Sequence, residues 1–187
     1  MHKALPVIAL LLASACPLPV FAQDSAPQAT GKKLSPSQAV LESWSDIGRK
    51  LTAMAEDFPE DKYDFKTTPA QRSFGDQLMH AAGANYYFTN LMNGQKPPSS
   101  DDLKRGNKSK AEVVAFVKKS IADGAAAIQA KGDKGMDELI VDPFSKDQAR
   151  IYDFAYGFVE HMGEHYGQLV VYYRMAGLVP PESRPKK

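Results

Sequence analysis

The chain has 187 residues, with 23 basic and 22 acidic side chains, and Cys16 is its single cysteine. A length of this order suits one domain with a full hydrophobic core. The balanced charge offers no electrostatic attraction to nucleic acid or to an anionic lipid surface, so we expect no nucleic-acid partner.

Residues 1–22 have the pattern of a secretory signal peptide. A basic start at Lys3 is followed by an apolar run, Ala4–Ala15, and by small residues up to Ala22. The apolar run is shorter than the roughly 20 residues that a membrane span needs. We therefore expect cleavage after Ala22, no membrane span, and a periplasmic or secreted protein.

Cys16 bears on both the anchor and the chemistry of the mature chain. Leu12-Ala-Ser-Ala-Cys16 loosely resembles a lipoprotein cleavage site, so a lipoprotein anchored at Cys16 is the alternative to simple cleavage. Cleavage after Ala22 removes the cysteine, which excludes disulfides, thiol catalysis and thiolate metal ligands. It also removes Lys3, so 22 of the 23 basic side chains remain against 22 acidic ones.

Residues 23–34 are rich in Ala, Gln, Ser, Pro and Lys, and we expect a flexible N-terminal lead-in there. Beyond them, a Ser or Thr stands three residues before a Gln or Glu at four places, which is the capping-box pattern of a helix start. The four places are Ser35–Gln38, Thr68–Gln71, Ser109–Glu112 and Ser145–Gln148.

Each capping box precedes an amphipathic run, so the pattern predicts four helices. They span about 36–56, 69–92, 110–130 and 146–176. Gly177 follows the last helix as a suitable left-handed C-cap. No segment alternates like a strand over a useful length. We therefore predict an all-α four-helix bundle over residues 35–183, with a basic tail at 184–187.

The last predicted helix carries two histidines four residues apart, in His161-Met-Gly-Glu-His165. This spacing stacks both imidazoles on one face of a helix. They belong to a run of side chains spaced by three and four residues, which predicts a heptad-type seam facing the bundle interior. The seam consists of Ile151, Phe154, Phe158, His161, His165, Gln168, Tyr172 and Met175. Among the tyrosines, Tyr172 is the best candidate to line a pocket.

A buried imidazole needs partners, because an unsatisfied buried polar group costs about 1–3 kcal/mol. One metal ion would satisfy both His161 and His165. His80, in the second predicted helix, is the one other histidine outside the predicted leader, and packing of the second helix on the fourth would bring it to the pair. Three histidines form the ligand set of a catalytic zinc-type site with an open position for water. The alternative is that they are hydrogen-bonded core or helix-edge side chains.

Glu164 lies between the paired histidines and completes the H-x-x-E-H pattern of inverzincin proteases. We do not expect a protease, because we expect such enzymes to need an acidic ligand well downstream, and only 22 residues follow His165. A di-iron carboxylate bundle is excluded too, since its tetrad of Glu-x-x-His motifs is missing. Glu164 is a candidate catalytic base, or a group that orients a ligand. It is also compatible with a solvated flank, since it points about 60–100° away from the histidines on the helical wheel.

One histidine in the second helix, a His-x-x-x-His pair in the fourth and a Gly-x-x-Pro ending together resemble the DinB-like superfamily of metal-binding bundles. The resemblance covers about residues 36–183 and is carried by two stretches, Phe65–His80 and His161–Pro181. It implies a bundle of the up-down-down-up type, with a divalent ion, zinc or nickel, bound by the three histidines. It also implies water at the open positions, and dimers occur in the family, so a homodimer is a further expectation.

The resemblance leaves the reaction open. Characterised relatives include thiol-S-transferases and a thiol-dependent isomerase, but an exported protein would work away from cytosolic small thiols. We therefore predict a metal-dependent hydrolase or transferase acting on a small molecule. A non-catalytic bundle stabilised by its metal, and a metal-free interaction module, are the alternatives.

Overall fold

The computed structural model describes residues 31, 33–99 and 103–185. The predicted signal peptide, the alternative lipid anchor at Cys16 and most of the predicted lead-in lie outside these residues. From Leu34 onward the described chain belongs to one unit. Within that unit, the described residues contain no helix long and apolar enough to cross a membrane.

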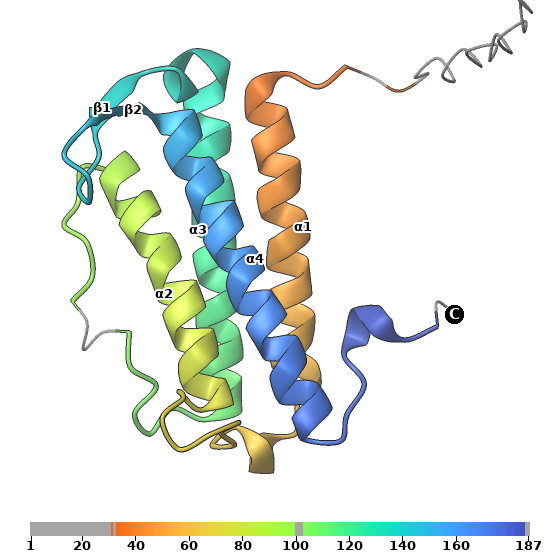
Figure 1. The fold of residues 1–187 in the computed structure, drawn as a ribbon. Coiled ribbons are helices and arrows are strands. Elements are labelled where there is room, and N and C mark those ends of the chain that lie inside the picture. Colours follow the sequence, from red (N-terminus) through yellow and green to blue (C-terminus); the bar gives the residue numbers. More distant parts are fainter. Residues whose placement is uncertain (1–30, 32, 100–102, 186–187) are drawn as a thin grey trace, which may run out of the picture. The chain divides into compact units, whose positions relative to one another are not determined.

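Four long helices make up most of the described chain (Figure 1). They are α1 (Pro36–Asp57), α2 (Phe74–Met92), α3 (Lys110–Met136) and α4 (Ile151–Met175). Single turns of 3-10 helix follow α1 and α4, namely η1 (Glu60–Lys62) and η2 (Pro181–Ser183). The predicted four-helix bundle is confirmed.

The helices are not arranged as a simple meander. α1 and α4 run in one direction and α2 and α3 in the other, because the chain returns to the opposite end of the bundle before α3 begins (Figure 1). α1 packs against α3 and α4, and α2 packs against the same two helices. This is the up-down-down-up arrangement that the family resemblance implied. It makes α2 and α4 neighbours although some sixty residues separate them in the sequence.

Two of the four predicted capping boxes begin helices. Ser35 and Ser109 each accept a hydrogen bond from the backbone N–H three residues on, at Gln38 and Glu112, whose side chains bond back to the cap. These reciprocal bonds satisfy two donors that a helix start leaves unpaired. α3 continues past its predicted end to Met136, through a kink at a glycine with positive φ.

The predicted C-cap of α4 is also confirmed. Gly177 has φ +76° and donates its N–H to Arg174 O, while Leu178 donates to Tyr173 O. These two bonds form a Schellman motif, in which a residue in the left-handed region satisfies the last carbonyls of the helix.

The capping box at Thr68 does not begin a helix. α2 starts only at Phe74, where Ser73 is the cap and accepts a hydrogen bond from Asp76 N. The segment before it is held by backbone bonds to the α1–α2 connection, including Phe74 N–H to Phe65 O at 2.9 Å. Both Thr68 and Ser73 can cap a helix, and the packing of the α1–α2 connection favours the start at Ser73.

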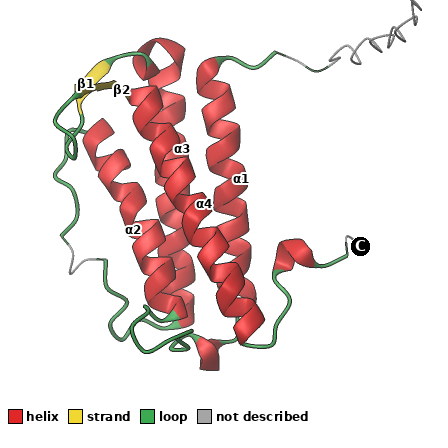
Figure 2. Ribbon diagram, in the orientation of Figure 1, coloured by secondary structure: helices red, strands yellow, loops and turns green. Residues whose placement is uncertain are grey.

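The box at Ser145 lies in a β-hairpin, so the predictions of a helix start and of no strands are both wrong here (Figure 2). Strands β1 (Leu139–Val141) and β2 (Gln148–Arg150) pair antiparallel. The turn between them is closed by Asp142, whose side chain accepts hydrogen bonds from the N–H groups of Phe144 and Ser145. α4 follows β2 directly.

The core shows why the helices pack closely. Trp44 of α1 is fully buried and donates its indole N–H to Ile121 O of α3 at 2.9 Å. Its ring lies against Gly124, where an added Cβ would come within 2.0 Å of Trp44 Cζ2. A glycine is therefore required at this contact between α1 and α3.

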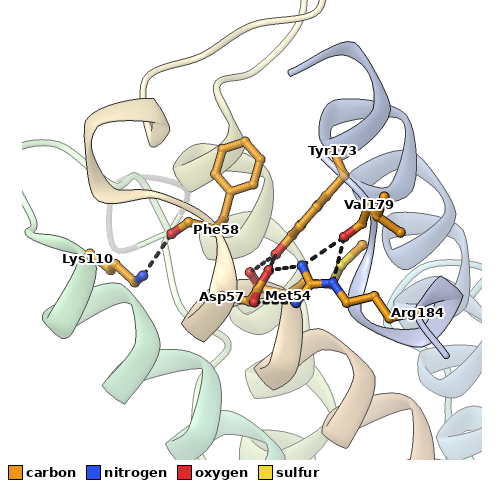
Figure 3. A network of polar contacts seen from close by, with 7 residues as sticks. All are labelled: Met54, Asp57, Phe58, Lys110, Tyr173, Val179 and Arg184. Carbon is orange, nitrogen blue, oxygen red and sulfur yellow. Dashed lines mark hydrogen bonds and ion pairs between the residues drawn. The ribbon is translucent and has the colours of Figure 1, made fainter. Parts of the chain in front are cut away.

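A polar network around Tyr173 joins the C-terminal ends of α1 and α4 (Figure 3). The Tyr173 hydroxyl donates to Met54 O at 2.9 Å and to Asp57 Oδ2 at 3.2 Å. Arg184 from the predicted basic tail donates to the same carboxylate, with one N–O distance of 2.7 Å. This Arg184 guanidinium lowers the pKa of Asp57. Arg184 is thus tied to α1.

Candidate metal centre

The three predicted ligands come together between α2 and α4. His80, His161 and His165 each offer one ring nitrogen, and these nitrogens lie within 4.8 Å of one another. The Nε2 atoms of His161 and His165 are 3.0 Å apart. The His80 ring centroid lies 4.8 Å from that of His165. Within the described residues, no Cys, Asp or Glu joins this group.

The histidines lie at the edge of the bundle core rather than along its centre. Met162 and Leu169, which the predicted seam leaves out, are fully buried, while Gln168 and Met175 of that seam are exposed. The interior-facing stripe of α4 is therefore rotated toward Met162 and Leu169. This rotation leaves His161 half-buried, so it can face a ligand as well as its neighbours.

Two glutamines hold the ring of His165. Gln168 Oε1 and Gln77 Nε2 lie 3.0 Å and 2.6 Å, respectively, from His165 Nδ1. Gln77 Nε2 also donates a hydrogen bond to Gln168 Oε1. If both glutamine side-chain amides are rotated by 180°, Gln77 Oε1 instead of Gln168 Oε1 accepts the hydrogen bond from His165 Nδ1–H. In either orientation of the amides, an oxygen is available to a proton on His165 Nδ1. A proton held there leaves Nε2 with its lone pair facing the other histidines.

His161 differs from His165 in its second nitrogen. Its Nδ1 is buried and, among the described residues, has no hydrogen-bond partner. Leaving such an atom unsatisfied costs about 1–3 kcal/mol. His161 therefore lowers the stability of the fold through this unpaired nitrogen. Such a loss of stability is typical of a residue with a functional role.

The environment keeps the imidazoles neutral. Burial, followed by the positive charge of Arg72, lowers the pKa of His80 to about 4. Burial and the neighbouring His165 lower the pKa of His161 to about 4 as well. Burial also lowers the pKa of His165. An imidazole binds a metal ion in its neutral form, so all three histidines are in the protonation state that metal binding requires.

Two cavities meet at the histidine cluster. One, of about 590 Å³, is lined by both His80 and His161. The other, of about 740 Å³, is lined by His80 and by Arg72. Ala84 and Tyr87 of α2 border both cavities. Volumes of this size accommodate a small molecule.

Glu164 and Tyr172 do not have the surroundings expected of site residues. Glu164 is exposed, and neither cavity at His80 is lined by it. Its charge still reaches His165, where it favours the protonated ring. Tyr172 is buried and donates its hydroxyl to Arg72 O at 2.6 Å. It therefore anchors the chain next to the cavity instead of lining it.

Gln77 and Arg72 also belong to the site, although the sequence pattern did not indicate them. Gln77 stands one helical turn before His80, on the same face of α2, and this spacing could have indicated a partner. Arg72 was placed inside a predicted helix, and only the true start of α2 at Phe74 leaves it at the mouth of the site.

The donor set fits a divalent metal ion. Tetrahedral zinc with Zn–N bonds of about 2.0–2.1 Å places two ligand nitrogens about 3.3 Å apart. The 3.0 Å separation of the His161 and His165 Nε2 atoms is close to that value. The protein is thus a four-helix bundle with three clustered histidines beside a cavity that His80 and His161 line.

The family follows from a comparison of sequences. The profile of the DinB superfamily matches residues 44–169, a span that includes all three histidines. The chain belongs to the DinB superfamily. A search of curated proteins found no match.

Solved structures agree on the fold. A DinB-like protein from Bacillus cereus ATCC 10987 is 20% identical, with a TM-score of 0.64 over 76% of this chain and 93% of that one. A DinB-like protein (YjoA) from Bacillus subtilis is 17% identical, with a TM-score of 0.61 over 79% and 99%. YfiT from Bacillus subtilis, described as a probable metal-dependent hydrolase with an unusual four-helix bundle topology, is 13% identical, with a TM-score of 0.59 over 79% and 93%.

Proposed function

We propose that this protein is a metal-dependent enzyme of the hydrolase or transferase class, in which His80, His161 and His165 bind a zinc or nickel ion. One observation carries the proposal: nitrogens of three histidines converge beside two cavities, of which His80 lines both and His161 lines one. No fourth His, Cys, Asp or Glu joins them within the described chain, which favours open coordination. The description of YfiT as a probable metal-dependent hydrolase supports the same class.

The protein would position the metal ion and orient its histidine ligands. When bound, a divalent ion with open positions supplies Lewis acidity to a substrate oxygen or lowers the pKa of water. Gln77 and Gln168 orient His165 through the hydrogen bonds at its Nδ1. The helix pair α2 and α4 fixes the three imidazoles, because each sits in the middle of a packed helix rather than on a loop.

Metal content of the purified protein tests the ligand set. We expect about one equivalent of zinc, nickel or a similar divalent ion, and its loss in the double variant His161→Ala/His165→Ala. Glu164→Gln serves as the matched control, because it changes a charge on the same helix and keeps the three histidines. A wild-type protein that holds no metal and refuses added zinc and nickel would contradict the proposal. The 3.0 Å contact between His161 and His165 would then be an N–H···N hydrogen bond.

The coordination of the bound ion separates catalysis from structural stabilisation. X-ray absorption on the zinc- or nickel-loaded protein should show three imidazole nitrogens and exchangeable oxygen ligands, with a spectrum that changes on adding azide. Four protein ligands and no response to azide would identify a metal-stabilised bundle without catalysis.

We also propose that the protein acts outside the cytoplasm, because residues 1–22 have the pattern of a signal peptide. Mass spectrometry of the protein made in a bacterial host tests this. A mature chain that starts at Gln23 supports a periplasmic or secreted protein. A lipid-modified Cys16 would instead identify a lipoprotein, and an uncleaved chain would contradict export.

A further inference from the structure

The two cavities at His80 differ in chemistry, although they share a wall. We call the 590 Å³ cavity the aromatic bay, because Phe144, Phe154 and Phe158 line it. We call the 740 Å³ cavity the arginine bay, because it holds the Arg72 side chain. A molecule long enough to lie across the shared wall would meet an apolar surface at one end and a guanidinium at the other.

The aromatic bay is built from two elements that the sequence keeps apart. Phe154 and Phe158 come from α4, with ring centroids 5.1 Å apart. Phe144 comes from the hairpin turn and lies 6.2 Å from Phe154 and 5.9 Å from Tyr87 of α2. Phe144 is nevertheless 64% exposed, so its ring offers a free face for an apolar or aromatic group.

The arginine bay offers a cation whose backbone is fixed. Arg72 directly precedes the cap of α2, and its carbonyl accepts the Tyr172 hydroxyl at 2.6 Å. Its guanidinium has no ion-pair partner within residues 33–99 and 103–185. Asp76 lines the same bay, but its carboxylate accepts the Ser73 hydroxyl at 2.6 Å. The bay therefore keeps an unpaired planar donor for an anion.

Acidic groups set the direction in which an anion would lie. Asp142 and Asp153 line the aromatic bay, and Asp153 is already paired with Arg150 at 2.7 Å. Their negative charge disfavours an anionic group at that end. The same anion is favoured beside Arg72, so a ligand with a single negative charge has one preferred orientation across His80.

From this juxtaposition of Arg72, His80 and the aromatic bay we propose that the site takes a small carboxylate with an aromatic or other apolar body. The carboxylate pairs with the Arg72 guanidinium, and the apolar body lies against Phe144 and Phe158. The inference rests on the proposed function, since it assigns the substrate class of the same site.

A carboxylate fits this bay better than a phosphate ester does. Arg72, Lys104 and Asp76 line the bay and together give it a net charge of +1, which balances a single negative charge better than two. The planar fork of an arginine also matches the two oxygens of a carboxylate.

Calorimetry with model ligands tests the proposal on the purified zinc-loaded protein. We expect 4-phenylbutanoate to bind at least tenfold more tightly than its neutral amide. Arg72→Gln should remove this preference and weaken binding of the acid by about tenfold. Arg174→Gln is the matched control: it removes an exposed arginine of α4 about 20 Å along the helix from His161. Equal binding of acid and amide, or an unchanged affinity in Arg72→Gln, would overturn the proposal.

A second variant tests the apolar end. Phe144→Ala removes an exposed ring, so the fold is retained. It should weaken binding of 4-phenylbutanoate several-fold and leave binding of butanoate unchanged. If both acids bind Phe144→Ala as they bind the wild type, the assignment of the aromatic bay is wrong.

Metal content measured on the same samples separates this proposal from the proposed function. A protein that holds zinc and shows no preference for the acid contradicts the substrate class alone. A protein that holds no metal and still binds the acid through Arg72 supports the carboxylate site while contradicting the metal-dependent function.

Discussion

α4 carries two polar clusters whose partners differ. Toward its C-terminal end, Tyr173 donates to Met54 O and Asp57, and Arg184 donates to that carboxylate as well. Near the middle of the helix, His161 has a buried nitrogen that no described residue satisfies, and its other nitrogen faces a second imidazole. The helix is the same, but only one cluster is complete within the protein.

The difference shows how structural and functional polar groups are told apart. A network whose donors and acceptors are all paired rigidifies the fold and needs nothing more. A cluster of neutral imidazoles whose Nε2 atoms face one another beside a cavity gains its missing interactions from a ligand. Four predictions test this contrast, in order of decreasing effect.

Removing the metal should have the largest effect. A ligand at about 1,000 times its Kd stabilises the folded state by about 4 kcal/mol, or roughly 10 °C in Tm for a domain of this size. We expect EDTA to lower the Tm of the wild type by this amount and to leave the Tm of His161→Ala/His165→Ala unchanged. An unchanged wild-type Tm would contradict the claim that the histidine cluster, unlike the Tyr173 network, is completed by a ligand.

Gln168→Ala should weaken metal binding without unfolding the protein, because Gln168 is exposed and orients His165. Loss of a group that orients a ligand reduces metal affinity by about 10–100-fold. Competition with a chromophoric chelator measures the effect. Gln129→Ala, on the exposed face of α3, is the control and should bind metal like the wild type. Identical affinities for the two variants would show that the glutamines do not position the ligand.

Tyr173→Phe should affect stability alone. It removes the hydroxyl that pairs with Met54 O and Asp57, at a cost of about 1–2 kcal/mol in the free energy of unfolding. The ring keeps its packing on Phe58, with centroids 4.9 Å apart. Urea unfolding measures the cost, and metal affinity should be unchanged. A loss of metal in this variant would mean that the two clusters are coupled along α4.

Arg184→Ala should have the smallest effect on the free energy of unfolding, because the pair with Asp57 is partly exposed and its attraction is screened by water. Arg184 lowers the pKa of Asp57 in the folded state. The stability from this pair is therefore present above the unfolded pKa of about 3.9 and lost as the pH falls through the folded pKa. Unfolding at pH 7 and pH 2 should show a difference between wild type and variant that shrinks at low pH. A difference that grows on acidification would contradict the assignment.

Helix starts could be predicted from the sequence where no tertiary contact favoured another start. Ser35 and Ser109 both begin helices as predicted. Thr68 competes with Ser73, and the backbone bond from Phe74 to Phe65 favours the later start. At Ser145 the turn at Asp142, which precedes a proline, supplies an alternative that the capping pattern does not reveal.

The sequence was enough to predict which three histidines would cluster, because His161 and His165 are spaced by one helical turn and His80 is the remaining candidate. It also determined the bundle, since amphipathic runs must bury their apolar faces against one another. That α2 lies beside α4, that Arg72 borders the site and that the hairpin brings Phe144 to it became clear from the packed structure alone. The reason is physical: periodicity is a local property of a helix, whereas neighbours across the bundle depend on how all four helices share one core.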